Sequence, residues 1–269
     1  MNPNANQERY VEAAIAAVQA GLRCAMELAQ KEVDVTVKSG VDIVTAADVA
    51  AEDAMRHVLN ARCAELPIVG EERGGEAEGD AYWLLDPICG TRNYASGLPL
   101  YACNLAVVQR GVATVGVVGD GCTGQVFAGI RGRGAFNASQ PGRPALLVRS
   151  AGIVALDLTG KPPFDSPRAA GNLFASLCGD GRFHVRFLGT TLPFAKVACG
   201  DFAAAMLIGG VVDPLHIAAG VALAEAAGAR VTDAYGKAWD LRSPSCVAAA
   251  TPSLHEHLLK LIQGAFGGP

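Results

Sequence analysis

The sequence lacks several features that mark whole classes of protein. Its eight cysteines show no C-x-x-C spacing and no regular framework, which indicates buried reduced thiols in a cytoplasmic protein rather than a disulfide-stapled domain. There is no basic stripe, and 22 basic residues face 26 acidic ones, so nucleic acid is not an expected partner. The longest apolar runs, such as residues 202–212, contain glycines and are too short to cross a bilayer, so a membrane partner is not expected either.

The sequence also lacks an export signal, an internal repeat and a flexible linker. Residues 1–9 are polar and carry no hydrophobic region, so secretion is not expected. No internal repeat or flexible linker interrupts the 269 residues, and the 32 glycines are spread out, as tight turns require. Since 51% of the residues are hydrophobic, the chain can bury a large core in one domain or in two closely packed halves.

The pattern of the first half predicts helices packed on a largely antiparallel sheet. Helical spacing of apolar residues predicts a long amphipathic helix over 7–31, and Thr45 with Asp48 has the form of a capping box that starts a second helix reaching about residue 62. Strands are expected at 34–38, 66–69, 84–86, 103–110, 112–120 and 125–130.

The second half alternates strands and helices. Strands are expected at 145–150, 152–158, 185–188, 203–208 and 247–250, and helices at 172–177, 192–198, 213–228 and 254–264. Asp213 is the expected N-cap of the third helix and Ser253 that of the last. A boundary near residue 140 would divide two half-domains, 1–140 and 141–269, with a cleft between them.

Residues 83–94, W-L-L-D-P-I-C-G-T-R-N-Y, combine a short buried strand, an acidic turn and a possible helix start. Asp86 would leave the strand end pointing into a cleft, and the proline after it would turn the Ile88 carbonyl toward the same point. Gly90 and Thr91 would offer free N–H groups to an anion. A carboxylate and a carbonyl beside such a helix end indicate a hard metal ion held against a phosphate. The plainer interpretation is an Asx-type turn, in which Asp86 bonds only its own loop.

This block resembles the D-P-I/L-D-G-T signature of the inositol monophosphatase family. Further resemblances follow the family's order: the G-E-E loop at 70–72, D-x-V-T-x-x-D at 42–48, the R-G-x-G-A-F hairpin at 131–136, and the A-A-G…E-A-G-G helix at 217–228. Together these motifs span about residues 38–240. The resemblance implies an α/β (α+β) fold, namely a layered α/β/α/β/α sandwich with its site at the junction of the two halves.

Family members hydrolyse phosphate monoesters with Mg²⁺, and the resemblance carries this chemistry onto particular residues. It implies that Glu71, Asp86 and the Ile88 carbonyl hold a first metal ion, which lowers the pKa of a bound water. Thr91 would orient that water with Asp48 as its acidic partner. For Asp48, helix capping is an equally plain role.

Three further assignments complete the implied first site. Glu72 joins the catalytic set, although the plainer interpretation of Glu71 and Glu72 is a solvated loop. The N–H groups of Gly90 and Thr91 would bind the phosphate and stabilise its growing charge. Arg92 replaces the family's usual threonine, and because arginine opposes the dipole at a helix N-terminus, we expect it to reach a substrate phosphate instead.

The second metal position departs from the family pattern. There the family uses the shared first aspartate, the second signature aspartate and the aspartate of a W-D pair, and this chain has Asp86, Cys89 and His216. The tryptophan is replaced by Leu215. The family's acidic residue that grips the polyol falls near Gly209 and is absent, which argues against an inositol phosphate substrate.

Two interpretations of this departure are open. Either the hard-oxygen site is lost, or carboxylate, thiolate and imidazole form a site for Zn²⁺, Mn²⁺ or another transition metal. A third possibility is that Asp213, three residues before His216, supplies the missing carboxylate ligand. The plainer role of Asp213 is that of a helix N-cap.

The resulting hypothesis is metal-dependent hydrolysis of a small phosphate monoester in the cytoplasm. Mg²⁺ is the expected cofactor, and a small phosphorylated metabolite is the expected partner. The resemblance also implies a homodimer. The alternative is a catalytically degenerate protein of the same fold that binds a phosphorylated ligand or has a regulatory role.

Overall fold

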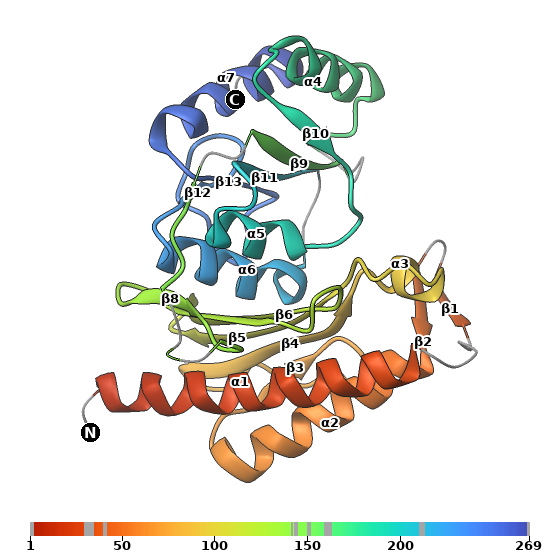
Figure 1. Cartoon of the computed structure of the whole chain (residues 1–269), viewed down its shortest axis with the longest axis vertical. Coiled ribbons are helices and arrows are strands. Elements are labelled where there is room, and N and C mark those ends of the chain that lie inside the picture. The colour runs from red at the N-terminus through yellow and green to blue at the C-terminus, as the bar shows by residue number, and fades with distance from the viewer. Residues whose placement is uncertain are drawn as a thin grey trace.

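The computed structural model describes residues 3–29, 35–39, 42–140, 142, 145–149, 152–158, 163–209 and 213–267. Within these ranges the chain folds into five layers that alternate helices and sheets (Figure 1). The N-terminus lies with one outer layer and the C-terminus with the opposite one (Figure 1).

The first outer layer is a pair of helices, α1 (Pro3–Leu28) and α2 (Ala46–Cys63), packed against each other and against one face of a sheet. The capping box predicted for α2 is confirmed, because the side chain of Thr45 accepts from the Asp48 N–H and Asp48 accepts from the Thr45 N–H. Asp48 is thereby locked, fully buried, into the first turn of α2.

The second layer is a six-stranded sheet with the order β3-β4-β5-β6-β7-β8. Its strands are β3 (Ile68–Gly70), β4 (Ala81–Cys89), β5 (Ala102–Gln109), β6 (Val112–Asp120), β7 (Val126–Ile130) and β8 (Gly134–Asn137). Only the pair β3–β4 is parallel among these strands, so the expected largely antiparallel sheet is confirmed. A short helix, α3 (Thr91–Ala95), follows β4 and contacts a hairpin of β1 (Val35–Ser39) and β2 (Asp42–Thr45).

The middle layer consists of α5 (Leu192–Cys199) and α6 (Pro214–Ala226). Apolar residues are distributed around helix α6 between His216 and Glu225, and the residues from Ile217 to Ala224 are all buried, as expected for a helix covered from several directions. The predicted N-cap is confirmed, since the carboxylate of Asp213 accepts from the Leu215 N–H at 3.0 Å.

The fourth layer is a five-stranded sheet with the order β10-β9-β11-β13-β12, and the outer helices α4 and α7 cover it as the fifth layer (Figure 1). Its strands are β9 (Ile153–Leu158), β10 (His184–Arg186), β11 (Ala204–Ile208), β12 (Arg230–Thr232) and β13 (Ser245–Ala249). The helices are α4 (Pro167–Gly179) and α7 (Pro252–Phe266). Residue 140 falls between the last strand of the first sheet and the first strand of the second, and the division into half-domains at that point stays a prediction.

Several expected elements differ from the structure. The strand predicted at 145–150 is wrong over its described part, because Ala145 forms a single bridge to Phe136 and residues 146–149 are irregular. The last helix begins earlier than expected, because the cap is Thr251, which accepts from the Leu254 N–H, and not Ser253. No helix in the described ranges combines the length and the apolarity that crossing a membrane would require.

Candidate active site

The turn that leads from β4 into α3 is shaped by its own sequence. β4 pairs with β5 up to Asp86, loses register at the following proline, which has no N–H to donate, and pairs again at Cys89. Gly90 has φ +105°, and a Cβ there would lie 3.0 Å from the carbonyl oxygen of Leu100. Glycine is therefore required at the point where the chain enters α3.

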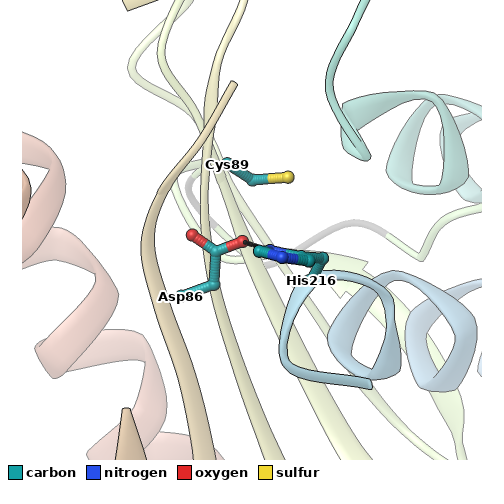
Figure 2. A group of neighbouring side chains, drawn as sticks. All are labelled: Asp86, Cys89 and His216. Carbon is teal, nitrogen blue, oxygen red and sulfur yellow. Dashed lines mark hydrogen bonds and ion pairs between the residues drawn. The ribbon is translucent and has the colours of Figure 1, made fainter. Parts of the chain in front are cut away.

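Asp86 is fully buried and presents its two carboxylate oxygens in different directions (Figure 2). Oδ2 lies 2.8 Å from Nδ1 of His216, across the boundary between the first sheet and the middle helix layer. Oδ1 has no hydrogen-bond partner among the described residues. A buried carboxylate oxygen without a partner is energetically costly, so this atom marks a place where a cation would be stabilised.

Cys89 completes a group of three potential metal donors. One donor atom each from Asp86, Cys89 and His216 lies within 4.8 Å of the other two. Asp86 and Cys89 are buried, whereas the His216 side chain is 38% exposed. The group therefore opens to solvent on the histidine side. Burial of the imidazole opposes its protonation, but hydrogen bonding to Asp86 and Cys89 outweighs this and raises the pKa of His216. Burial also raises the pKa of the Cys89 thiol.

Two neighbouring polar residues hold this group in place. The Thr191 hydroxyl lies 2.9 Å from the Cys89 sulfur, and the Thr191 N–H donates to the same sulfur at 3.4 Å. The same hydroxyl and the Asn104 amide both reach the backbone carbonyl of His216, at 2.8 and 2.9 Å. The first turn of α6 is thus tied to β5 and to the residue before α5.

Thr91, Asp48 and the Ile88 carbonyl form a second constellation beside Asp86. The Thr91 hydroxyl lies 3.2 Å from Oδ1 of Asp48 and 3.1 Å from the carbonyl oxygen of Ile88, and it can donate its proton to either. Burial raises the pKa of Asp48, although hydrogen bonds from Thr45 and Thr91 oppose the shift. Capping and contact with Thr91 are therefore compatible, because they use different oxygens of one carboxylate.

Glu71 lies beside Asp86 in the backbone register of the parallel pair β3–β4. Gly70 pairs with Leu85, and the Glu71 N–H donates to the Leu85 carbonyl at 3.1 Å. Neither Glu71 nor Glu72 belongs to the three-donor group. Both glutamates are half-buried, so they are not simply solvated as a free loop would be.

The predicted phosphate-binding residues surround the start of α3. Gly90 and Thr91 are half-buried there, and Arg92 is exposed on the next position of the helix. The N–H groups of a first helical turn have no partners within the helix, and binding of a phosphate by Gly90 and Thr91 stays a prediction. Asp213 does not join the donor group, and it acts as the N-cap of α6.

Some site residues were missed by the sequence analysis. Thr191 and Asn104 were not singled out, although Asn104 is an amide between apolar neighbours in the interior of β5, which is a signal for a buried polar contact. Glu52 was also missed. It is fully buried on α2 and accepts from the N–H groups of Glu72 and Arg73, so it fixes the loop that carries Glu71.

Comparison with known proteins identifies the family. The profile described as "Inositol monophosphatase family" matches residues 6–265. The chain belongs to the inositol monophosphatase family. It is 33% identical over 237 residues to inositol-1-monophosphatase ImpA of Mycolicibacterium smegmatis, which covers 84% of this chain and 82% of ImpA.

Two other comparisons extend this result. The chain is 32% identical over 240 residues to Nus factor SuhB of Pasteurella multocida, covering 86% of each protein. The crystal structure of extragenic suppressor protein suhB from Bartonella henselae has a TM-score of 0.80 and 22% identity, and it covers 96% of this chain and 98% of that one. The layered α/β sandwich expected from the motifs is therefore confirmed. Membership of the inositol monophosphatase family supports a metal-dependent phosphatase kind of function acting on small phosphorylated substrates.

Proposed function

We propose that this chain hydrolyses a small phosphate monoester with the help of Mg²⁺. The observation that carries the proposal is the unpartnered oxygen of buried Asp86, five residues before Thr91, whose hydroxyl contacts Asp48. Residues 86–91 thus combine a carboxylate oxygen suited to a cation, a hydroxyl that can pass a proton to Asp48 on α2, and the start of a helix suited to an anion.

Oxygen donors around Asp86 suit Mg²⁺ at the first metal position. Oδ1 of Asp86 lacks a partner among the described residues, the Ile88 carbonyl faces the same turn, and Glu71 follows the adjacent strand. Carboxylate and carbonyl oxygens are the ligands that Mg²⁺ prefers. When bound there, Mg²⁺ would lower the pKa of a coordinated water and polarise a phosphoryl oxygen.

The chain's own residues would supply the remaining chemistry. The Thr91 hydroxyl orients the attacking water and passes a proton toward Asp48, whose raised pKa makes it a better proton acceptor. The N–H groups of Gly90 and Thr91 bind the phosphate, and Arg92 contacts the substrate from the exposed side. Glu72 remains the third proposed catalytic residue of this set.

The absent polyol-gripping acid argues against inositol phosphate as the substrate. Gly209 follows β11 where the family's acidic residue is expected, so no carboxylate from that position can bind sugar hydroxyls. A sugar bisphosphate or a bisphosphate nucleotide fits the proposal better. A cytoplasmic location and a homodimer stay predictions.

A catalytically degenerate protein that binds a phosphorylated ligand is the second candidate. It is favoured by the exchange of two family metal-ligand aspartates for Cys89 and His216. One relative of this chain is named as a Nus factor and not as a phosphatase, which also favours this alternative.

A phosphatase assay separates the two candidates. Metal-free protein is supplied with Mg²⁺, Mn²⁺ or Zn²⁺ and a panel of small phosphate monoesters, and released phosphate is measured. We expect turnover that Asp86→Asn lowers at least about 100-fold, since several kcal/mol of transition-state stabilisation depend on this ligand. Asp180→Asn, at the far outer layer, is the control and should leave turnover unchanged.

Two results would count against hydrolysis. Turnover that survives Asp86→Asn would belong to a contaminant. Binding of phosphate esters without turnover under any of the three metals would favour the degenerate ligand-binding protein.

A further inference from the structure

The second metal position does not fit Mg²⁺. Mg²⁺ requires near-octahedral oxygen ligands, and two of the three donors here are the sulfur of Cys89 and the imidazole of His216. A carboxylate, an imidazole and a thiolate are instead the ligand types that bind Zn²⁺. Mn²⁺ fits less well, because it favours oxygen donors.

The spacing of the donors suits one small ion. Zn²⁺ lies about 2.0–2.3 Å from nitrogen, oxygen and sulfur ligands, so two donors on one ion are roughly 3–4 Å apart. The donor atoms of Asp86, Cys89 and His216 are within 4.8 Å of one another, which small side-chain adjustments can close. Figure 2 shows the three side chains converging from β4 and α6 on one point.

Hydrogen bonds behind the donors hold them in a defined arrangement. The Cys89 sulfur receives the Thr191 N–H and contacts the Thr191 hydroxyl, while Thr191 and Asn104 anchor the backbone of His216. Metal ligands in proteins are oriented by such outer contacts. Both Cys89 and His216 can bind a metal, and both contact Thr191. Simple loss of the metal site would not require either feature.

We propose that Asp86, Cys89 and His216 form a three-ligand site for Zn²⁺, with the fourth position open toward solvent on the His216 side. Three protein ligands with one open position are typical of catalytic zinc sites. The inference deepens the proposed function, on which any catalytic role of this ion rests. Binding of the ion itself does not depend on turnover.

Cobalt provides the direct test, because Co²⁺ occupies zinc sites and a cobalt–thiolate bond gives a charge-transfer absorption in the near ultraviolet. Untagged, metal-free protein is titrated with Co²⁺, and Zn²⁺ affinity is then measured by competition with a chromophoric chelator. We expect a single saturable charge-transfer band that Zn²⁺ abolishes. Cys89→Ser should remove the band and weaken Zn²⁺ binding at least tenfold.

Matched variants separate this site from other thiols and from misfolding. Cys103→Ser removes a buried thiol on the neighbouring strand β5 and should leave the band intact. Thr191→Ala keeps all three donors but removes the hydroxyl behind them, and should weaken Zn²⁺ binding roughly 10- to 100-fold. Circular dichroism would be used to check that each variant is folded.

The double variant Cys89→Asp with His216→Asp makes the test reciprocal. It should lose the cobalt–thiolate band and bind Mg²⁺ at least tenfold more tightly than the parent chain. A parent chain without the band, or one whose Zn²⁺ affinity is unaffected by Cys89→Ser, overturns the inference. Zinc binding without phosphatase activity would leave the inference standing and refute the proposed hydrolysis, whereas Mg²⁺-dependent turnover without zinc binding would do the reverse.

Discussion

The two carboxylate oxygens of Asp86 have different surroundings. Oδ2 faces the imidazole of His216, and Oδ1 faces a region where the described residues offer no hydrogen-bond donor. Because the side chain is fully buried, its charge must be stabilised by neighbours and not by bulk water. His216 satisfies one oxygen only, which leaves the other suited to a cation.

Arg92 is the residue whose predicted role can be tested alone. It is exposed on α3, whose first turn is the proposed phosphate site, so its removal should cost substrate affinity and leave the fold intact. A charge-assisted hydrogen bond contributes about 1.5–3 kcal/mol, so Arg92→Ala should raise KM by roughly tenfold or more with little change in kcat. Steady-state kinetics would measure KM and kcat for this variant. Arg168→Ala, on the outer helix α4, is the control. An unchanged KM would remove Arg92 from the site.

Among the elements, α6 determines where His216 lies. The helix is buried between the two sheets, and the first sheet approaches its backbone closely at Gly116 of β6. A Cβ at Gly116 would lie 2.1 Å from the backbone oxygen of Ala219, three residues after His216. Only glycine allows this helix to pack so close to the strand, so the same contact that fills the core also positions the imidazole.

Gly116→Ala should therefore destabilise the fold and disturb the site together. Overpacking against the backbone costs about 1–3 kcal/mol, so the urea midpoint followed by circular dichroism should fall. The cobalt–thiolate absorption should weaken as well, because α6 has to move. Gly171→Ala on α4 has open space around it and should stabilise the protein by up to about 1 kcal/mol. Equal effects of the two substitutions would contradict this account of α6.

At the scale of the whole molecule, the site joins two layers. Asp86 and Cys89 belong to the first sheet, whereas His216 belongs to the middle helices and Thr191 to the segment that precedes them. The hydrophobic core between these layers is shared by residues from both sheets and from α5 and α6. An ion bound by all three donors would therefore cross-link parts of the chain that separate when the protein unfolds.

Zinc should consequently raise the stability of the folded chain. A ligand that binds only the folded state at 100 times its Kd adds about 2.7 kcal/mol, so calorimetry should show a higher Tm with Zn²⁺ and a lower one after chelation. Cys89→Ser should abolish most of that difference. A Tm that does not respond to Zn²⁺ in the parent chain would mean that the donors do not bind it in the folded state.

Much of the architecture could be predicted from local pattern. Periodicity located α1 and the strands β3 to β7 of the first sheet, although β8 was not expected from it. The capping signals at Thr45 and Asp213 were confirmed, because caps depend on residues a few positions apart. The strand expected at 145–150 was wrong, since a run of apolar residues does not reveal whether a partner strand is available. The cap at Ser253 was displaced by a competing threonine two residues earlier.

The sequence by itself determined the family motifs, the acidic turn at Asp86 and the presence of Cys89 and His216 at positions where the resemblance implies two oxygen ligands. Only the tertiary structure decided that these residues face one another, because 130 positions separate Asp86 from His216 along the chain. It also decided that Thr191 and Asn104 support them. Contacts of this kind depend on how two sheets and a helix layer pack, and local sequence carries no direct record of that packing.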